Sequence, residues 1–366
     1  MATDTKTVEA ILDRRLEAVF PSRSEVVKRL SEENGLRVYL GIDPTGPLHI
    51  GHVIPVLFLN DLRRIGHKPV ILIGDFTATI GDPTDKEKAR TALTEEQVRH
   101  NMQGYLDQLK RFLPEFDVEY NSKWLKPMSL GDVVRLASGV TVQQMLARDM
   151  FQERLKAERP IYLHEFLYPL MQGYDSVAME IDGEVGGNDQ TFNMLVGRDL
   201  ARAHLHKDKL VFATKLLADP QTGKKMSKTE DNFIALSDSP QEIRRKILNF
   251  PDALTPLVFQ LCTDVDLDSI PKDAREAKEY LSDELVRLIH GEAATNQARE
   301  PVTVPPQGTL AQSLKEWGAA SSMSEAKNLI TGGGVVVNDQ TVIDWNYKPA
   351  SGDRVQVGKG KFYQVS

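Results

Sequence analysis

The chain has 366 residues, more than one hydrophobic core usually organises, so two or three domains are expected. Its 45 basic and 52 acidic side chains give a formal net charge of -7, which argues against a globally basic nucleic-acid binder. The single cysteine, Cys262, excludes an internal disulfide or a multi-cysteine zinc site and is expected to be a buried apolar side chain in a reducing compartment. No apolar run approaches the ~20 residues that span a bilayer. We therefore expect a cytoplasmic protein without a membrane role.

Strand-like runs alternate with amphipathic helical stretches over residues 36–236. The runs "LRVYLGI", "KPVILIGDF" and "KLVFATKLL" are rich in apolar and β-branched residues, and the segments between them have a helical period. Such alternation predicts an α/β domain whose parallel strands are joined by crossover helices. The residues before this region are expected to form a helical extension.

The remaining chain divides into two further blocks. Residues 237–300 are helical in period, with "SPQEIRRKILN" opening on a Ser-Pro helix start and "AREAKEYLSDELVRLIHG" ending on glycine. The breaker-rich "REPVTVPPQG" predicts a linker over 301–308. After it, "LAQSLKEWG" and "SEAKNLITGG" predict two short helices, and "GVVVND", "DRVQVG" and "KFYQV" predict short strands, so residues 309–366 are expected to form a small α+β domain.

Two histidines lie at the turn between the predicted strand "RVYLGID" and the predicted helix "IGHVIPVLFLNDLRRIG". This turn is at the carboxyl edge of a parallel sheet, where ligands bind, and the helix N-terminus favours anions, so a phosphate site is predicted. Neither GxxxxGK[ST] nor GxGxxG occurs in the chain, so the phosphates must be bound in a different way. His49 and His52, one helical turn apart, would donate hydrogen bonds, and Gly51 would leave room for an adenine ring.

A lysine-rich loop, "QTGKKMSKTEDN" at 221–232, follows the strand-like "KLVFATKLLAD". Residues 198–228 carry eight lysines and arginines against three aspartates in an otherwise acidic protein, so we expect a polyanion to bind there. A lysine run by itself is usually a solvated surface loop. Because this run accompanies the histidine turn, a site for nucleotide phosphates is favoured.

The sequence "HIGH" followed by "KMSKT" resembles the signature pair of the class I aminoacyl-tRNA synthetases, HIGH and KMSKS. The resemblance implies that ATP activates an amino acid as an aminoacyl-adenylate, with Mg2+ sharing the phosphate charge, before transfer to the terminal ribose of a tRNA. The chemistry agrees, because attack of a carboxylate on the α-phosphorus needs alignment and charge neutralisation and no enzymic nucleophile. Lys225 and Lys228 would close over the β and γ phosphates.

The predicted helix "LYPLMQGYDSVAME" places Tyr168, Gln172 and Asp175 at positions i, i+4 and i+7, on one face. An ordinary helix with a polar stripe would show the same spacing. A buried acid needs a partner, however, and Asp175 with Tyr39 on the first strand could clamp a phenolic hydroxyl. Tyr168 and Gln172, together with Asp82, would bind an α-ammonium group. These side chains therefore indicate a pocket for tyrosine.

The constellation resembles the bacterial-type tyrosyl-tRNA synthetase family over almost the full chain, through "YLGIDPT", "IGDPTDKEKAR", "YPLMQGYD" and "GGNDQTFN". The resemblance implies L-tyrosine, ATP and tRNA(Tyr) as partners, a homodimer, and no metal ligand supplied by the chain. The catalytic residues that it implies are His49, His52, Lys86, Arg90, Lys225 and Lys228. The tyrosine-binding residues are Tyr39, Asp82, Tyr168, Gln172, Asp175 and Gln190. The ATP-binding residues are Gly41, Asp43, Thr45, Gly51, His52, Gly187, Asp189, Gln190, Lys225, Met226 and Lys228.

The same resemblance implies roles for the domains. Residues 1–236 would be a Rossmann-like catalytic domain with an insertion at about 94–169 that forms the dimer, and residues 237–300 would be an α-helical anticodon-binding domain. Residues 309–366 resemble a small RNA-binding module of a ribosomal protein, although their six basic and five acidic side chains do not by themselves indicate RNA binding.

Three alternatives stay open. A tryptophanyl enzyme would share the fold and the signatures, but an indole N–H offers one donor and no acceptor to the pair of Tyr39 and Asp175. A nucleotidyltransferase of the same superfamily would explain both signatures and would leave the helical and C-terminal blocks without a role. An RNA-binding regulator built on an inactive synthetase would not need the intact signature residues.

Overall fold

The computed structural model describes residues 3–82, 93–218, 233–358 and 361–366. The chain divides into two compact units. One is Met1–Leu217 with Gln260–Cys262, and the other is Ala218–Phe259 with Thr263–Ser366. Within the described residues, no helix is long and apolar enough to cross a membrane.

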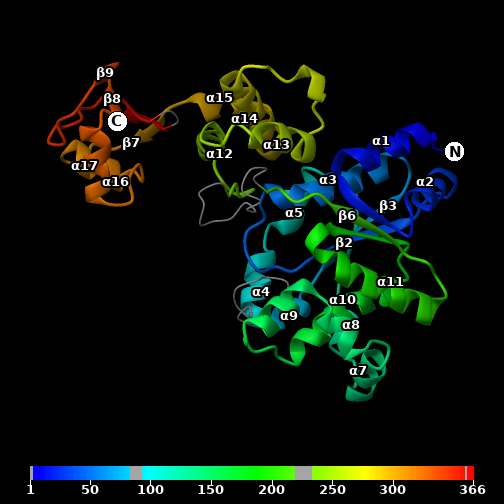
Figure 1. The fold of residues 1–366 in the computed structure, drawn as a ribbon. Coiled ribbons are helices and arrows are strands. Elements are labelled where there is room, and N and C mark those ends of the chain that lie inside the picture. Colours follow the sequence, from blue (N-terminus) through cyan, green and yellow to red (C-terminus); the bar gives the residue numbers. More distant parts are fainter. Residues whose placement is uncertain (1–2, 83–92, 219–232, 359–360) are drawn as a thin grey trace. The chain divides into compact units, whose positions relative to one another are not determined.

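A six-stranded sheet forms the centre of the first unit (Figure 1). Its strands follow the order β1-β6-β5-β2-β3-β4, and every neighbouring pair is parallel except β1 with β6. The predicted α/β fold is therefore confirmed. The strands are β1 (Leu16–Phe20), β2 (Arg37–Ile42), β3 (Lys68–Ile73), β4 (Asp117–Tyr120), β5 (Gly183–Gly187) and β6 (Leu210–Thr214).

The N-terminal extension differs from the expectation, because it is not wholly helical. Its strand β1 pairs antiparallel with β6, from Leu16 opposite Thr214 to Phe20 opposite Val211. The run "LEAVF" directly follows the first helix, and its apolar and β-branched residues fit a half-buried edge strand. An antiparallel edge strand on an otherwise parallel sheet is common in α/β proteins.

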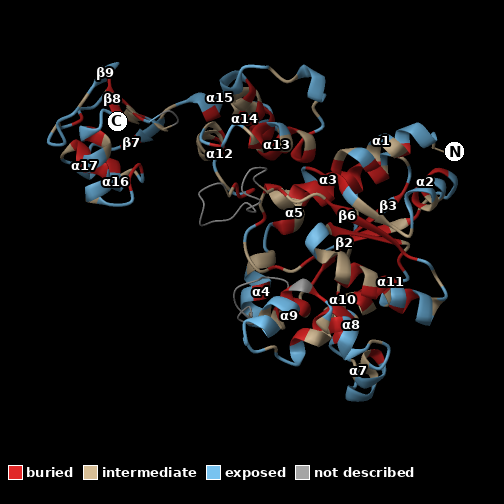
Figure 2. Ribbon diagram, in the orientation of Figure 1, coloured by how far each residue is buried: buried red, intermediate tan, exposed pale blue. Residues whose placement is uncertain are grey.

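Helices cover both faces of this sheet, with α3 on one side and α10 and α11 on the other (Figure 1). Figure 2 shows α3 and the central strands as largely buried, and α7 as mostly exposed. The helices of this unit are α1 (Thr5–Arg15), α2 (Arg23–Glu32), α3 (Ile50–Arg64), α4 (Glu95–Met102), α5 (Tyr105–Lys110), α6 (Ser122–Leu125), α7 (Leu130–Ala137), α8 (Val142–Leu146), α9 (Asp149–Lys156), α10 (His164–Ala178) and α11 (Thr191–Leu205), with the 3-10 helices η1 (Thr77–Thr79) and η2 (Asn188–Gln190).

The helices α10 and α11 approach each other closely at two glycines. A Cβ atom on Gly173 would lie 2.9 Å from Leu200 Cδ1 and 3.1 Å from the backbone nitrogen of Gly197. Neither distance is a normal contact, so a side chain at this position would force the helices apart. Because α10 carries the predicted tyrosine-binding residues, this contact positions the pocket.

The second unit begins with helices, as predicted for residues 237–300. They are α12 (Pro240–Leu248), α13 (Leu254–Cys262, of which Gln260–Cys262 count with the first unit), α14 (Ala274–His290) and α15 (Ala293–Arg299), with the 3-10 helix η4 (Leu267–Ser269). The Ser-Pro start is confirmed, because Ser239 caps α12 and accepts a hydrogen bond from the backbone nitrogen of Glu242. Gly291 ends α14 with a φ of 88°, which glycine adopts readily.

The C-terminal part of this unit has two helices and a five-stranded sheet of order β7-β11-β10-β8-β9. Its elements are β7 (Val302–Val304), α16 (Leu310–Glu316), α17 (Met323–Thr331), β8 (Val335–Val337), β9 (Gln340–Thr341), β10 (Arg354–Val357) and β11 (Lys361–Val365). The predicted linker over 301–308 is therefore wrong in part, since β7 pairs with β11 in parallel. The prolines that suggested a linker flank "VTV" without interrupting it, and its β-branched valines and threonine favour a strand.

Candidate active site

The two signature histidines are fixed by the start of α3. His49 is the N-cap residue, and its Nδ1 accepts a hydrogen bond from the backbone nitrogen of Gly51 at 3.1 Å. The backbone nitrogen of His49 in turn donates to Nδ1 of His52 at 3.2 Å. Since both Nδ1 atoms are acceptors, the proton of each neutral ring is on Nε2, which makes Nε2 the donor. The prediction that these rings act as hydrogen-bond donors is consistent with this geometry.

Gly51 is required by the packing of the same turn. A Cβ atom at this position would lie 2.8 Å from Cε1 of His49, so any larger residue would displace the ring. The predicted role of Gly51 beside an adenine ring stays a prediction, because the clash found here is with His49.

Asp43 lies directly after β2. It is a predicted ATP-binding residue and is bonded to Tyr168, a predicted tyrosine-binding residue. Its Oδ2 accepts from the hydroxyl of Tyr168 at 2.8 Å, and its Oδ1 accepts from Thr77 Oγ1 at 2.7 Å. Gly74 permits this approach, because a Cβ atom there would lie 1.9 Å from Asp43 Oδ1. Burial first, and then the carboxylates of Asp43 and Asp82, raise the pKa of Tyr168 well above its ordinary value.

Asp175 is 2% exposed and is held by two donors from another part of the chain. Trp124 Nε1 donates to its Oδ1 at 2.7 Å, and Asn121 Nδ2 donates to its Oδ2 at 3.3 Å. The amide of Asn121 is oriented by the backbone nitrogen of Phe76, which donates to its Oδ1. Burial raises the pKa of Asp175 well above its ordinary value, against the lowering effect of the two bonds from Trp124 and Asn121.

Tyr39 on β2 is fully buried. Its hydroxyl lies 3.1 Å from Oγ of Ser176, the residue after Asp175 on α10. Burial raises the pKa of Tyr39 well above its ordinary value, and the carboxylates of Glu184 and Asp175 add to this effect. The predicted pairing of Tyr39 with Asp175 therefore has both groups in one buried region, with Ser176 as an additional partner that was not predicted.

Two of the three predicted ammonium-binding residues, Gln172 and Asp82, belong to one chain of amide hydrogen bonds. Gln172 Nε2 donates to Glu184 Oε1 at 3.1 Å, and Asn193 Nδ2 donates to Gln172 Oε1 at 3.0 Å and to Gln190 Oε1 at 2.9 Å. Gln190 Nε2 then donates to Asp82 Oδ2 at 2.8 Å. The structure thus brings Gln172, Gln190 and Asp82 together.

The other predicted nucleotide-binding residues that the structure describes lie at the same edge of the sheet and make fewer side-chain contacts. The backbone nitrogen of Thr45 donates to the carbonyl oxygen of Asp43 at 2.8 Å. Gly187 is the last residue of β5 and the exposed Asp189 follows it, and a Cβ atom on Gly187 would lie 2.5 Å from Asp189 Oδ1. Gly41 is exposed, and a Cβ atom there would only touch Tyr39 at 3.8 Å, so packing does not require this glycine. Lys86, Arg90, Lys225, Met226 and Lys228 lie outside the described residues.

The basic stretch at 198–228 does not present its full charge to a polyanion. Within its described part, Arg198 and Arg202 both pair with Asp208, and Lys207 pairs with Asp182 at 2.5 Å. Lys209 is fully buried and pairs with Glu184. A count of charges in sequence does not reveal that half of these side chains neutralise acids of the same domain.

Five residues that contact the predicted site residues or one another there were not found from the sequence: Asn121, Trp124, Ser176, Glu184 and Lys209. Asn121 directly follows β4, a four-residue strand, and its position at the carboxyl edge of the sheet was the signal available. Glu184 lies in "GEVGG". Glycine has a low strand propensity, so this strand was not predicted from the sequence. Lys209 directly precedes β6 in a run that was interpreted as a surface patch.

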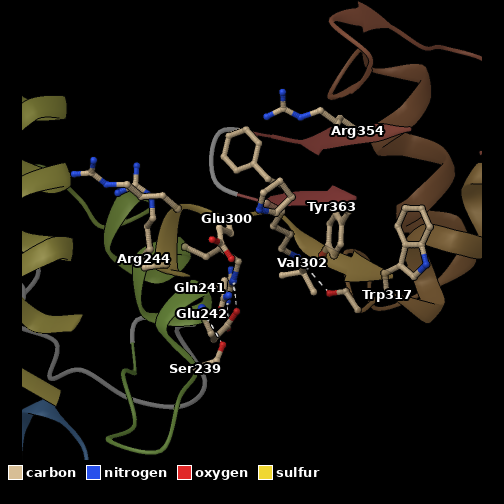
Figure 3. A pocket seen from close by; sticks show the side chains of 16 residues that line it. Ser239, Gln241, Glu242, Arg244, Glu300, Val302, Trp317, Arg354 and Tyr363 are labelled. Atoms are coloured by element: carbon tan, nitrogen blue, oxygen red, sulfur yellow. Dashed lines mark hydrogen bonds and ion pairs between the residues drawn. The ribbon is translucent and has the colours of Figure 1, made fainter. Parts of the chain in front are cut away.

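The second unit contains a groove of about 380 Å³ lined by basic and aromatic side chains. Arg244 and Arg245 of α12, Arg354 of β10 and Tyr363 of β11 are among its lining residues (Figure 3). Arg245 is engaged by Glu242 through two hydrogen bonds, whereas Arg354 is exposed. Exposed arginine beside aromatic rings is a composition that suits RNA.

Known proteins match both parts of the chain. Residues 31–303 match the family model of tRNA synthetases class I (W and Y), and residues 309–355 match the S4 domain. The tyrosine--tRNA ligase of Nostoc sp. is 40% identical over 390 residues, covering 97% of this chain and 98% of that protein. The tyrosine--tRNA ligase of Thermotoga maritima is 37% identical over 376 residues, covering 94% of each.

Solved structures agree with this relationship. A C-terminally truncated mitochondrial tyrosyl-tRNA synthetase of Coccidioides posadasii has a TM-score of 0.66 at 25% identity, covering 80% of this chain and 90% of that one. A tyrosyl-tRNA synthetase of Archaeoglobus fulgidus, solved with L-tyrosine, shares the fold with a TM-score of 0.62 at 18% identity, over 80% of this chain and 99% of that one. The sheet, the histidine turn and the family model place the chain among the class I tRNA synthetases of the tryptophan and tyrosine group. Within this group, the near full-length relatives show that it belongs to the tyrosine--tRNA ligase family.

Proposed function

We propose that this protein activates L-tyrosine with ATP and transfers the tyrosyl group to the 3'-terminal ribose of tRNA(Tyr). The observation that carries the proposal is the buried pair of Tyr39 and Asp175. Asp175 is 2% exposed, and its carboxylate is oriented by donors from Trp124 and Asn121. A phenol can donate to a carboxylate and accept from a hydroxyl, and so it can use both members of the pair. The indole of tryptophan can only donate, and so it matches the pair less well.

The opposite end of the pocket supplies acceptors for an α-ammonium group. Tyr168 donates its hydroxyl proton to Asp43, which leaves the phenolic oxygen as an acceptor. Gln172 donates through its nitrogen to Glu184, which leaves its carbonyl oxygen as an acceptor. Asp82 adds negative charge on the same side. An ammonium group has three donors and no acceptor, and so it matches these three oxygens.

The first reaction step is an attack of the tyrosine carboxylate on the α-phosphorus of ATP. A carboxylate oxygen forms a bond to this phosphorus while the bond to the bridging oxygen of pyrophosphate breaks, and the leaving group takes the electron pair. His49 and His52 would donate from Nε2 to phosphate oxygens at the N-terminus of α3. Donors that are already oriented stabilise the developing charge without reorganisation.

In the second step, a ribose hydroxyl of the tRNA attacks the acyl carbon of tyrosyl-adenylate. The new ester bond forms while the bond between the acyl carbon and the phosphate oxygen breaks, and AMP leaves with that electron pair and takes up the proton of the hydroxyl. The described residues supply no covalent nucleophile to either step in this proposal. Their role is to bind and align the substrates.

Mg2+ would accompany ATP through the phosphate oxygens. Among the described residues, no group of three His, Cys, Asp or Glu side chains is arranged to hold a metal ion. The donors at the start of α3 are imidazole and backbone N–H groups, which suit phosphate oxygens better than a cation. These residues fit a magnesium ion that is coordinated mainly by the triphosphate, where it would neutralise part of the phosphate charge.

Domain roles follow from the same proposal. Residues 1–236 would catalyse, 237–300 would bind the anticodon region, and 309–366 with β7 would bind tRNA through the groove that Arg354 lines. Six large apolar side chains between residues 130 and 163 are 48–79% exposed, which supports the segment 94–169 as a homodimer interface. The interface side chains would be Leu130, Val134, Val142, Leu155, Tyr162 and Leu163. The single cysteine agrees with a cytoplasmic location.

ATP–pyrophosphate exchange, measured with each amino acid in turn, tests the proposal. Exchange that depends on tyrosine and not on tryptophan is the expected result. Exchange with tryptophan instead would make the chain a tryptophanyl enzyme. Exchange that needs no amino acid would favour a nucleotidyltransferase, and RNA binding without any exchange would favour a regulator.

A further inference from the structure

Lys209 places an ammonium group in the interior of the first unit, where its side chain is 0% exposed. Its Nζ donates to Ser176 Oγ at 2.9 Å and to Glu184 Oε2, and it lies 5.9 Å from the centre of the Tyr39 ring. Gly197 on α11 makes the space, because a Cβ atom there would lie 2.6 Å from Nζ. Four elements, β2, β5, α10 and α11, thus meet around this one charge.

Stability alone does not explain a buried ion pair such as Lys209 with Glu184. Removing an ammonium and a carboxylate from water is costly, and apolar residues of similar volume can replace buried ion pairs without loss of stability. Burial lowers the pKa of Lys209, against the raising effect of Glu184, which reflects the same cost. A role in orienting neighbouring groups would explain why the charge is placed here.

One branch of contacts leads from Lys209 to the hydroxyl of Tyr39. Ser176 Oγ lies at hydrogen-bond distance from this hydroxyl, 3.1 Å away, and the carboxylate of Glu184 helps to raise the pKa of Tyr39. Lys209 is bonded to both of them. Ser176 Oγ accepts from the ammonium group, so its own hydrogen can donate to Tyr39, which leaves the Tyr39 hydroxyl hydrogen for the substrate. Lys209 therefore fixes how the Tyr39 hydroxyl can point.

The second branch leads to the amide of Gln172. Glu184 accepts from Lys209 at Oε2 and from Gln172 Nε2 at Oε1. With its nitrogen on Glu184, Gln172 has its carbonyl oxygen on the opposite side, where Asn193 Nδ2 lies at 3.0 Å. The amide can act as an acceptor for an ammonium group only in this orientation.

We propose that Lys209 is a positioning residue for tyrosine recognition, which sets the hydrogen-bond directions of Tyr39 at one end of the pocket and of Gln172 at the other. The proposal rests on the function proposed above. Lys209 does not touch the substrate and acts through Ser176 and Glu184. Its loss should affect tyrosine binding and the discrimination against phenylalanine, and it should leave the use of ATP unchanged.

Lys209→Met tests the proposal, together with Lys209→Met combined with Glu184→Met. In the single variant Glu184 is buried without a cation and takes up a proton, which makes it a donor toward Gln172 and lowers stability. The double variant removes both charges and is expected to melt near the wild-type temperature. Both variants should lose about 10- to 100-fold in kcat/KM for tyrosine, the scale of a misplaced contact. The KM for ATP should not change, and the ratio of tyrosine to phenylalanine activity should fall.

Lys207→Met is the matched control. Lys207 is two residues away, pairs with Asp182 at 2.5 Å, and is outside the network of the pocket, so its loss should leave the amino-acid ratio unchanged. A double variant that folds and has wild-type tyrosine KM and amino-acid ratio would show that the pair is only structural and would overturn the proposal. If neither Lys209 variant folds, Ser176→Ala, which removes only one hydroxyl, must lower the ratio, and an unchanged ratio overturns it. A wild-type protein that does not activate tyrosine would instead refute the proposed function.

Discussion

Trp124 Nε1 lies 2.7 Å from Oδ1 of Asp175 and donates a hydrogen bond to it. The two residues come from different elements, Trp124 from α6 after β4 and Asp175 from α10. This bond lowers the pKa of Asp175, whereas burial, the larger effect, raises that pKa well above its ordinary value. The protonation state of the predicted phenol acceptor therefore depends on a tryptophan that is distant in sequence.

The first prediction concerns pH. An acid with a raised pKa takes up its proton at higher pH than an ordinary aspartate, so kcat/KM for tyrosine should fall as the pH is lowered through this pKa. Trp124→Phe removes a bond that lowers the pKa, so the acidic limb should move to higher pH. Pyrophosphate exchange as a function of pH measures both profiles, with Asp175→Asn as a control that should lack this limb. A limb that stays in place in Trp124→Phe would contradict the role of Trp124.

The second prediction compares the two members of the phenol clamp. Asp175→Ala should cost about 3 kcal/mol in tyrosine kcat/KM, the scale of a hydrogen bond to a charged group, and phenylalanine should lose much less. Tyr39→Phe removes one neutral hydroxyl and should cost about 1 kcal/mol. Pyrophosphate exchange with both amino acids gives both values. A folded Asp175→Ala protein that keeps its full preference for tyrosine would remove the basis for assigning tyrosine as substrate.

The positions that could be predicted from the sequence are those that follow from local periodicity. Tyr168, Gln172 and Asp175 share a helix, so their spacing places them on one face wherever that helix packs. The edge of the sheet at His49 follows in the same way from a strand, a turn and a helix.

Contacts between segments that are distant in sequence could not be predicted from local periodicity. Trp124 reaches Asp175 only because β4 lies next to β3 in the sheet, and no local pattern contains that information. Lys209 and Arg198 were counted as surface charge because a sequence shows the charge of a side chain and not its partner. The three-residue strand β7 was missed because its flanking prolines suggested a linker, although its residues favour a strand and it pairs with β11.

The third prediction concerns the lysine-rich loop, which lies outside the described residues. Lys228→Ala should lower the rate of adenylate formation by about 100-fold or more, since contacts to pyrophosphate that strengthen in the transition state act mainly on kcat. Tyrosine binding should stay nearly unchanged. Pre-steady-state adenylate formation and equilibrium tyrosine binding separate the two effects. A variant that loses tyrosine affinity and keeps its rate would show that the assigned role is wrong.

The fourth prediction uses Cys262, which is fully buried at the end of α13. Burial raises the pKa of its thiol to about 12. The thiolate is the reactive form, so at pH 8 the native thiol should react with iodoacetamide roughly 1000-fold more slowly than a thiol of ordinary pKa. Labelling should proceed at an ordinary rate once the protein is unfolded in urea. Mass spectrometry of native and unfolded samples measures this, and rapid labelling of the native protein would contradict the packing of this helix.

The fifth prediction separates activation from transfer. A chain that ends after Pro301 has lost the whole second sheet, β7 to β11. A cut after Gly308 would instead keep β7 without its partner β11, so the cut after Pro301 is the cleaner one. The cut after Pro301 should keep tyrosine-dependent pyrophosphate exchange, because the residues of the pocket all belong to the first unit. Transfer of tyrosine to tRNA should fall strongly, since the removed segment matches the S4 domain and contributes Arg354 and Tyr363 to the basic groove.

Salt distinguishes loss of RNA contacts from a general loss of structure. Each phosphate contact that is removed should make the negative slope of log affinity against log salt less steep by about 0.7 to 0.9. The KM for tRNA should therefore rise with salt more steeply in the full chain than in the shortened one. For Arg354→Ala in the full chain, the salt dependence of the KM for tRNA should lie between those of the full and the shortened chain. This variant removes one exposed cation and leaves the sheet intact. Equal loss of exchange and transfer in the shortened chain would instead mean that the C-terminal part is needed for folding of the catalytic part.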